Sequence, residues 1–231
     1  KPLLDPSYAP LRQYYQREFV PRLNNNSEQV QTFEHFYPQD SAQAYLQNHY
    51  IALNDNLTGQ KNELISANTD RSAYRAVHEK YHPVLKNFQE KFGFYDIFLI
   101  DQATGNIVYS VFKEVDFATS LIDGPFANSN LGTLFRDIQD STNSDVAKMV
   151  DFSFYQPSYN QPASFIASPV FDGEEKVGTL IFQISIDKVN EITTGNKNWY
   201  LDGHGETGEN ILVGSDGKLR SQSRFLIEQP E

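Results

Sequence analysis

Cysteine is absent from this chain of 231 residues, so disulfide bonds, cysteine-ligated zinc and thiol catalysis are all excluded. Basic residues are scarce as well. The 19 Lys and Arg face 30 Asp and Glu, and the net charge of −11 repels phosphate backbones and anionic lipid headgroups. Apolar runs such as Ile97-Phe98-Leu99-Ile100 fall far short of the roughly 18 residues that mark a membrane span. We therefore expect no nucleic-acid binding, and no membrane contact made by this chain itself.

Apolar surface, in contrast, is plentiful enough for a sizeable core. Hydrophobic residues make up 39% of the chain, and its 17 Phe and 13 Tyr supply flat side chains that suit the walls of a pocket. A chain of 26.4 kDa is long enough for one large domain, or for one domain and part of another. Its first residues lack the apolar centre of a signal peptide, so we expect any targeting segment to have been cleaved or left out of this sequence.

Residues 1–92 are expected to form helices joined by loops rich in Asn and Gln. The third of these helices has the clearest pattern, and Gly93 ends it. Apolar side chains recur along it every three or four residues, which places them on one narrow stripe that we expect to pack against the core. The members of the stripe are Tyr74, Val77, Tyr81, Leu85, Phe88 and Phe92.

From residue 93 onward the pattern becomes that of β-strands. One helix at residues 131–138 interrupts the strands, and turns that contain glycine join the first two strands and the last two. This order predicts an α+β fold with a mainly antiparallel, five-stranded sheet on which the helices pack. The expected strands are residues 95–101, 107–112, 149–154, 164–171 and 176–186.

Three segments are expected along the chain. Residues 1–92 form the N-terminal helical region, with its long helix packed on the sheet, and residues 93–192 form the sheet module. Residues 193–231 contain a linker and one further hairpin around Gly214-Ser215-Asp216-Gly217. Because two strands alone are not stable in water, we expect this last segment to begin a second module that the sequence leaves incomplete.

One short motif points to metal chemistry. His78-Glu79-Lys80-Tyr81-His82 matches H-E-x-x-H on a helix, where two histidines can share zinc while the glutamate acts as a base. At about 100° per residue, however, His78 and His82 lie only about 40° and 80° from the centre of the apolar stripe. Pro83 also disturbs the helix directly after the motif. We favour a packing role, predict no catalytic residue and no cofactor, and keep a zinc metallopeptidase that uses these residues as the alternative.

Aromatic residues on the strands and loops of residues 93–192 are interspersed with a few polar ones. Such a mixture is typical of a site that orients a small polar molecule, although a core with a polar rim explains any one of these residues equally well. Tyr155 and Phe165 would supply walls, Lys113 would pair with an anionic group, and Asp116 with a cationic one. The predicted ligand contacts are Tyr109, Lys113, Asp116, Tyr155 and Phe165.

Several long segments in the same order resemble the double Cache sensor regions of bacterial membrane receptors, which have a PAS-like fold of the PDC type. Together they cover most of residues 74–228. The segments are Tyr81-His82-Pro83, Phe92-Gly93-Phe94-Tyr95-Asp96, residues 97–101, residues 107–121, Ala163-Ser164-Phe165-Ile166-Ala167, residues 168–173, Gly205-Glu206-Thr207-Gly208-Glu209-Asn210, residues 213–216 and residues 220–225.

The resemblance implies the extracytoplasmic, periplasmic part of a bacterial inner-membrane receptor. Its contact with the membrane would be made by transmembrane helices outside this chain, and its output would be a histidine kinase. A chemotaxis receptor and a diguanylate or adenylate cyclase are the alternatives. The segment itself would not be an enzyme and would bind an unknown small-molecule ligand, with a homodimer left open. A module that responds to a partner protein, with no small ligand, is a third interpretation.

Overall fold

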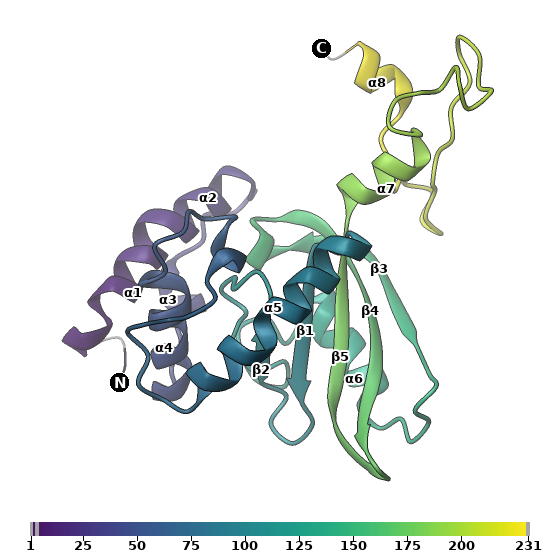
Figure 1. The fold of residues 1–231 in the computed structure, drawn as a ribbon. Coiled ribbons are helices and arrows are strands. Elements are labelled where there is room, and N and C mark those ends of the chain that lie inside the picture. Colours follow the sequence, from purple (N-terminus) through teal and green to yellow (C-terminus); the bar gives the residue numbers. More distant parts are fainter. Residues whose placement is uncertain (1, 3–4, 230–231) are drawn as a thin grey trace.

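The centre of the computed structural model, which describes residues 2 and 5–229, is an antiparallel five-stranded sheet (Figure 1). The strand order is β2-β1-β5-β4-β3, and every neighbouring pair is antiparallel. The predicted α+β class and the five strands are therefore confirmed. The strands are β1 (Asp96–Asp101), β2 (Ile107–Ser110), β3 (Lys148–Tyr155), β4 (Gln161–Asp172) and β5 (Glu175–Ser185).

One helix covers each face of the sheet. On one face lies α6 (Asn130–Gln139), whose apolar side chains enter the main core together with Phe98 and Phe165. On the other face lies α5 (Tyr74–Phe92), whose Leu85 packs against a smaller cluster that includes Ile97. Ser129 begins α6 because its hydroxyl accepts from the N–H of Gly132.

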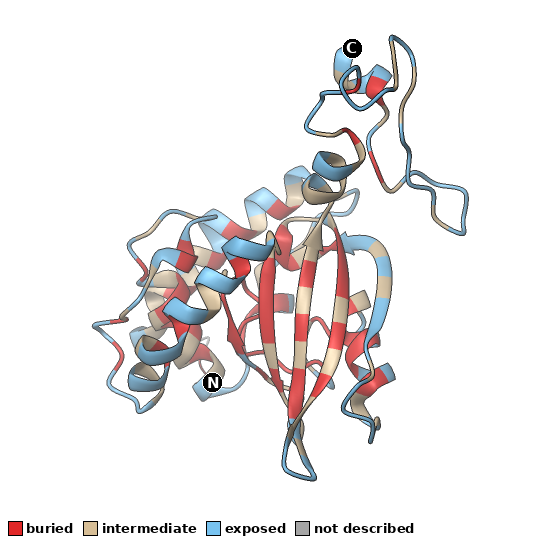
Figure 2. Ribbon diagram, turned by 45° about the vertical axis from the view of Figure 1, so that its right-hand side comes forward, coloured by how far each residue is buried: buried red, intermediate tan, exposed pale blue. Residues whose placement is uncertain are grey.

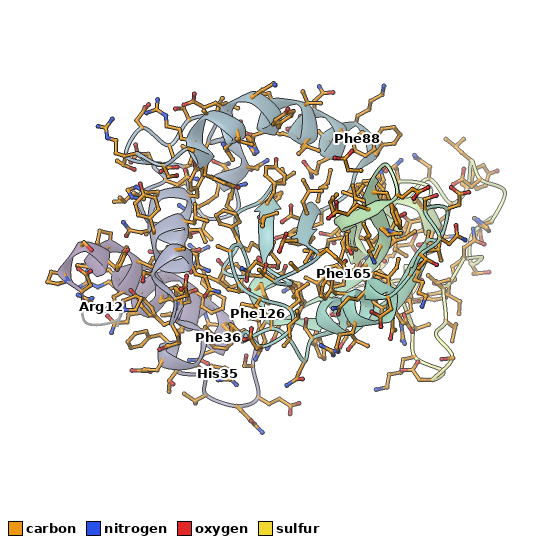
Figure 3. All side chains as sticks on the ribbon, turned by 90° about the horizontal axis from the view of Figure 1, so that it is seen from below. Arg12, His35, Phe36, Phe88, Phe126 and Phe165 are labelled. Atoms are coloured by element: carbon orange, nitrogen blue, oxygen red, sulfur yellow. The ribbon has the colours of Figure 1, made fainter. Side chains whose placement is uncertain are left out.

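The remaining N-terminal residues form short helices that cover the crossover segment, residues 111–129, between β2 and α6. Phe36 stacks on Phe126 of that segment, with ring centroids 5.8 Å apart, and Figure 3 shows the two side by side. Buried Gln47 donates to the carbonyls of Val115 and Phe117 over 2.8 Å each. These helices are η2 (Pro6–Tyr8), α1 (Ala9–Tyr14), η3 (Tyr15–Phe19), α2 (Val20–Asn25), α3 (Phe33–Phe36), α4 (Ser41–Gln47), η4 (Asn48–Ala52) and η5 (Lys61–Glu63).

The prediction for the packing face of α5 is wrong. Most of the expected stripe faces solvent, and the face turned to the core carries His78, His82 and Gln89 (Figure 2). Burial of this polar face is tolerated because each histidine ring has a hydrogen-bond partner. At 19 residues α5 is the longest helix described, and none of the described helices has the length and apolar character needed to cross a membrane.

The C-terminal residues leave the sheet at the end of β5 through α7 (Ile186–Thr193). They contain one isolated bridge, between Val213 and Leu219, at the position of the expected hairpin, and end in α8 (Arg224–Glu228). Arg220 ties this segment back to the edge strand β3, since its Nε and Nη2 donate to the two carboxylate oxygens of Asp151 over 2.9 and 2.8 Å. A short helix η6 (Gln156–Ser158) follows β3.

Candidate functional site

The five predicted ligand residues come from three strands and the crossover segment, and all of them are buried. Tyr109 lies on β2, Tyr155 ends β3 and Phe165 lies on β4. Lys113 and Asp116 lie at the start of the crossover segment. The most exposed of the five is Tyr109, at 6%. The structure therefore brings together residues that are far apart in the sequence.

These five residues form two contact groups. In the first, the Tyr155 hydroxyl donates to Asp116 Oδ2 over 2.6 Å, and the Tyr155 ring meets Phe165 edge to face at 5.0 Å. In the second, Lys113 Nζ lies 4.2 Å from the centre of the Tyr109 ring and donates to the carbonyl of Ser110. Lys113 thus pairs within the chain, with a π-face and a carbonyl.

A further buried carboxylate, Asp96 at the start of β1, was missed by the sequence prediction. Its Oδ1 accepts from the N–H groups of Ile97, Val111 and Phe112, so it fixes the chain just after β2. Its Oδ2 has no hydrogen-bond partner among the described residues. Burial raises the pKa of Asp96, and the neighbouring charge of Asp116 raises it further. An acidic residue directly before a run of four apolar residues was the signal that could have revealed it.

Glu114 is the third buried carboxyl in this region. It accepts hydrogen bonds from the hydroxyls of Tyr95, over 2.8 Å, and Ser158, over 2.7 Å. Gln183 on β5 in turn donates to Ser158, while its side-chain oxygen Oε1 has no partner in the described part of the chain. Burial raises the pKa of Glu114 well above its usual value. We name Asp96, Tyr109, Lys113, Glu114, Asp116 and Tyr155 the buried polar cluster.

Charge in the buried polar cluster is unbalanced, because it contains three buried carboxyl groups and a single buried lysine. Burial raises the pKa of Asp116 to about 6, an effect that the Tyr155 hydroxyl partly offsets. Burial also lowers the pKa of Lys113, against the attraction of Asp96. Asp116 Oδ1, like Asp96 Oδ2, has no hydrogen-bond partner within residues 5–229. Two buried carboxylate oxygens are therefore available to a donor that this chain does not supply.

Backbone strain coincides with this cluster. Lys113 and Ala118 have φ angles of 57° and 66°, in the left-handed region that side chains other than glycine seldom adopt. The segment keeps this conformation because neighbouring hydrogen bonds define it: the N–H of Phe117 donates to the Glu114 carbonyl, and that of Ala118 to the Ile107 carbonyl. Strained backbone that the surroundings hold in place is frequent at ligand sites and switch segments.

The two histidines of the H-E-x-x-H motif lie next to this cluster as stacked rings, with centroids 4.4 Å apart. His82 Nε2 donates to the Asn62 carbonyl over 2.8 Å, so its Nδ1 is the acceptor for the Tyr109 hydroxyl at 2.7 Å. His78 Nδ1 contacts the Ile65 carbonyl at 3.1 Å. Burial, followed by the charge of Lys113, lowers the pKa of both histidines, which keeps them neutral.

This geometry does not fit a zinc site. Both ring nitrogens of His82 already make hydrogen bonds, and Glu79 points to Ser66 and to Arg75, whose Nε lies 2.7 Å from its Oε1. A metal also needs further ligands, and the described residues contain no group of three or more His, Asp or Glu side chains placed to hold one. Both histidines are buried, hydrogen-bonded side chains on the core-facing side of α5.

Two surface clefts lie away from the buried polar cluster. One of about 870 Å³ runs between α3 with the loop after it, which contribute His35 and Asp40, and the crossover segment near Asp123. A second, of about 460 Å³, separates β3 from residues 216–222. Neither cleft is lined by any of the five predicted ligand residues. A ligand of the cluster would therefore have to enter through a rearrangement of the residues that cover it.

Comparison with known proteins yields no matching family model and no matching curated protein. Among solved structures the chain is similar to the ligand-binding domain of the Pseudomonas fluorescens chemoreceptor CtaA in complex with L-serine. The sequence identity is 15%, the TM-score is 0.42, and the match covers 90% of this chain and 74% of that one.

Two further similar structures come from other bacteria. The ligand-binding domain of the Campylobacter jejuni chemoreceptor Tlp3 in complex with 4-methylisoleucine has 10% identity and a TM-score of 0.45, with 98% of this chain and 77% of that chain covered. The sensor domain of the V. cholerae histidine kinase DctB has 15% identity and a TM-score of 0.38, with coverages of 83% and 61%. By their names, all three are sensor or ligand-binding domains.

Proposed function

We propose that this chain is the extracytoplasmic sensor domain of a bacterial membrane receptor and binds a small molecule in the buried polar cluster. The observation that carries the proposal is the pair of buried carboxylate oxygens, Asp96 Oδ2 and Asp116 Oδ1, that have no hydrogen-bond partner among the described residues. A buried, unpaired carboxylate costs several kcal/mol, so a cluster of this kind is expected where a ligand completes it. In this role the chain performs no catalysis of its own.

The composition of the cluster defines the ligand's chemistry. Because carboxyl groups outnumber lysine, the ligand carries at least one cationic N–H donor, which Asp116 accepts. Lys113 faces an anionic or carbonyl group of the same molecule, and the rings of Tyr155 and Phe165 form walls on the apolar side. A small zwitterion satisfies all three requirements, whereas a purely anionic molecule leaves the carboxylates unpaired.

Signalling in this proposal is a shift between two populations. In one state the crossover segment is closed over the cluster as described here, and in the other it is rearranged around the ligand. The hydrogen bond from Tyr109 to His82 couples the cluster to α5, and β5 leads directly into α7. A ligand in the cluster therefore acts on both α5, which precedes β1, and α7, which follows β5.

The wider arrangement is part of the same proposal. Residues 1–92 serve as a helical region, residues 93–192 as the membrane-distal, PAS-like sensor module, and residues 193–231 as a linker and the beginning of a second PAS-like module. The parent receptor is proposed to be a histidine kinase of the inner membrane, and the gene sequence on both sides of this segment tests that assignment. A chemotaxis signalling domain or a cyclase there would replace the kinase.

A thermal-shift screen tests ligand binding. The protein is heated with amino acids, small amines, polyamines and dicarboxylates, one compound at a time. A ligand at 100 times its Kd is expected to add about 2.7 kcal/mol to the free energy of unfolding. Stabilisation by a zwitterion or an amine supports the proposal. Stabilisation by dicarboxylates alone, or by no compound on the panel, contradicts it.

A further inference from the structure

The larger of the two surface clefts, of about 870 Å³, lies where three segments of the chain meet. One wall comes from α3, the start of α4 and the loop between them, a second from the crossover segment and the start of α6, and a third from the end of β3 and η6. Its volume is within the range of about 300–1,000 Å³ that is typical of small-molecule sites. We call it the amide cleft, and none of its lining residues belongs to the buried polar cluster.

Carboxamides dominate the polar lining of the amide cleft, because six of its residues are Asn or Gln. Three of them, Gln43, Asn128 and Gln156, come from the three different walls, and their side chains make no hydrogen bond to another described residue. A carboxamide offers two N–H donors and an oxygen acceptor. Hydroxyl groups, which both donate and accept, are therefore the ligand groups that match this lining.

Apolar surface accompanies these amides. Tyr37, Pro38, Phe126 and Pro157 are buried residues that form the floor of the cleft, and Phe154, which is 74% exposed, adds an aromatic ring at its rim. The face of an aromatic ring is negative and attracts C–H groups. A ligand that carries hydroxyls along its edge and C–H groups on its faces uses both parts of the lining, and a sugar ring is such a ligand.

The charge of the amide cleft disfavours anionic ligands. Its carboxylates are Asp40 and Asp123, and no Lys or Arg lines it. Two helices begin at the cleft, but side chains of the protein cap them: Asp40 accepts from the N–H groups of Ala42 and Gln43, and Ser129 caps α6. A phosphate or a carboxylate therefore finds no side-chain cation there, whereas each carboxylate of the cleft can accept from ligand hydroxyls.

We propose that the amide cleft binds a neutral saccharide of one or two rings. The amides of Gln43, Asn128 and Gln156 bond its hydroxyls, and Phe154 packs on the C–H face of one ring. The affinity is modest, because water competes for every hydrogen bond in an open cleft. This site goes beyond the proposed function, and neither site depends on the other.

A saccharide in the amide cleft would connect the N-terminal helical region to the sheet module. Phe36 of α3 already stacks on Phe126 of the crossover segment, and Gln156 directly follows Tyr155 at the end of β3. A bound ligand that contacts all three walls should therefore slow amide hydrogen exchange in residues 37–43, 123–130 and 153–157 together.

Isothermal titration with defined probes tests the proposal. The neutral probes are glucose, galactose, N-acetylglucosamine, maltose and trehalose, and the charged ones are glucuronate, inorganic phosphate and spermidine. At least one neutral sugar is expected to bind, with Kd raised about tenfold or more by Phe154→Ala and by Gln156→Ala. Tyr200→Ala and Gln60→Ala, at exposed residues outside the cleft, are the matched controls and should leave Kd unchanged. All four variants should keep the native circular dichroism spectrum.

Hydrogen exchange with the strongest of these sugars supplies the second readout, and protection of the three walls together supports the proposal. The proposal is overturned when none of the five neutral sugars binds, or when only a charged probe does. Sugar binding that both Phe154→Ala and Gln156→Ala leave intact overturns it too. Sugar binding lost in Asp116→Asn but kept in Phe154→Ala would assign the sugar to the buried polar cluster, so failure of one site is distinguishable from failure of the other.

Discussion

The hydroxyl of Tyr155 donates to Oδ2 of Asp116 over 2.6 Å, and neither side chain is exposed to solvent. The bond joins the end of β3 to the crossover segment, two parts of the chain that are 39 residues apart. The other carboxylate oxygen of Asp116, Oδ1, has no hydrogen-bond partner among the described residues. This pair is therefore expected to contribute to the stability of the module, and in the proposed function it also controls how readily the module accepts a ligand.

Tyr155→Phe is expected to destabilise the protein by about 1–3 kcal/mol. The substitution keeps the ring contact with Phe165 but leaves both oxygens of Asp116 without a donor, and an unsatisfied buried acceptor costs about that amount. Chemical denaturation measures the effect. Tyr200→Phe, at a residue 77% exposed, is the control and should change the free energy of unfolding by less than about 0.5 kcal/mol. Equal stability of Tyr155→Phe and wild type would contradict the assignment.

Asp116 should make stability depend on pH. Its pKa rises from 3.8 to about 6 on folding, so the folded state favours the protonated form. The stabilising contribution is thus complete below about pH 4 and is lost as the pH rises through about 6. Asp116→Asn cannot ionise, so wild type should lose on the order of 2–3 kcal/mol relative to this variant between pH 4 and pH 8.

The difference between the two proteins is the quantity to measure, because other groups titrate in the same range. His78 and His82 have lowered pKa values, so their contribution falls as the pH drops below about 6.5, opposite to that of Asp116. Denaturation curves of both proteins at several pH values cancel this contribution. A stability difference that does not vary with pH would show that Asp116 is ionised and well solvated in the folded protein.

Removal of the Tyr109 hydroxyl should affect α5, because His82 on that helix is its hydrogen-bond partner. In Tyr109→Phe, Nδ1 of buried His82 loses its donor, and the expected cost is about 1–3 kcal/mol. Imidazole resonances in NMR spectra should report the change at His82. Tyr81→Phe, on the exposed side of the same helix, should leave both the stability and the His82 signals unaltered.

The Arg220–Asp151 pair is expected to hold the C-terminal segment against β3. Arg220→Lys cannot donate to both carboxylate oxygens at once, so residues 194–223 should become more accessible to proteases and exchange amide hydrogens faster. Unfolding of the sheet should be little affected, because Asp151 lies on an exposed edge. Arg22→Lys, in an exposed pair with Glu18, is the control. Unchanged proteolysis of Arg220→Lys would show that other contacts hold this segment.

Much of the architecture could be predicted because local patterns determine it. Apolar runs located all five strands, with glycine-containing turns between the first two and between the last two, and Gly93, with a φ of 72°, ends α5 as its position after Phe92 indicated. The five ligand residues were predicted from their mixture of aromatic and polar character. The structure brings them together in the two contact groups, but their role as ligand contacts remains part of the proposal.

The packing face of α5 could not be predicted from periodicity. An apolar stripe normally marks the buried face. Here the buried face is fixed by partners distant in the sequence, such as Tyr109 and the Asn62 carbonyl, which satisfy His82. Asp96 was missed for a related reason. Asp96 accepts hydrogen bonds from the N–H groups of Val111 and Phe112, and only the fold of the chain after β2 brings these groups to it.

Isothermal titration of the strongest ligand from the thermal-shift panel tests the central claim most directly. The titration compares wild type with Asp116→Asn, Lys113→Met and Tyr200→Phe. We predict that Kd rises at least tenfold, or by about 1.4 kcal/mol, for the first two variants and is unchanged for Tyr200→Phe. Wild-type affinity in both Asp116→Asn and Lys113→Met would contradict a ligand site in the buried polar cluster.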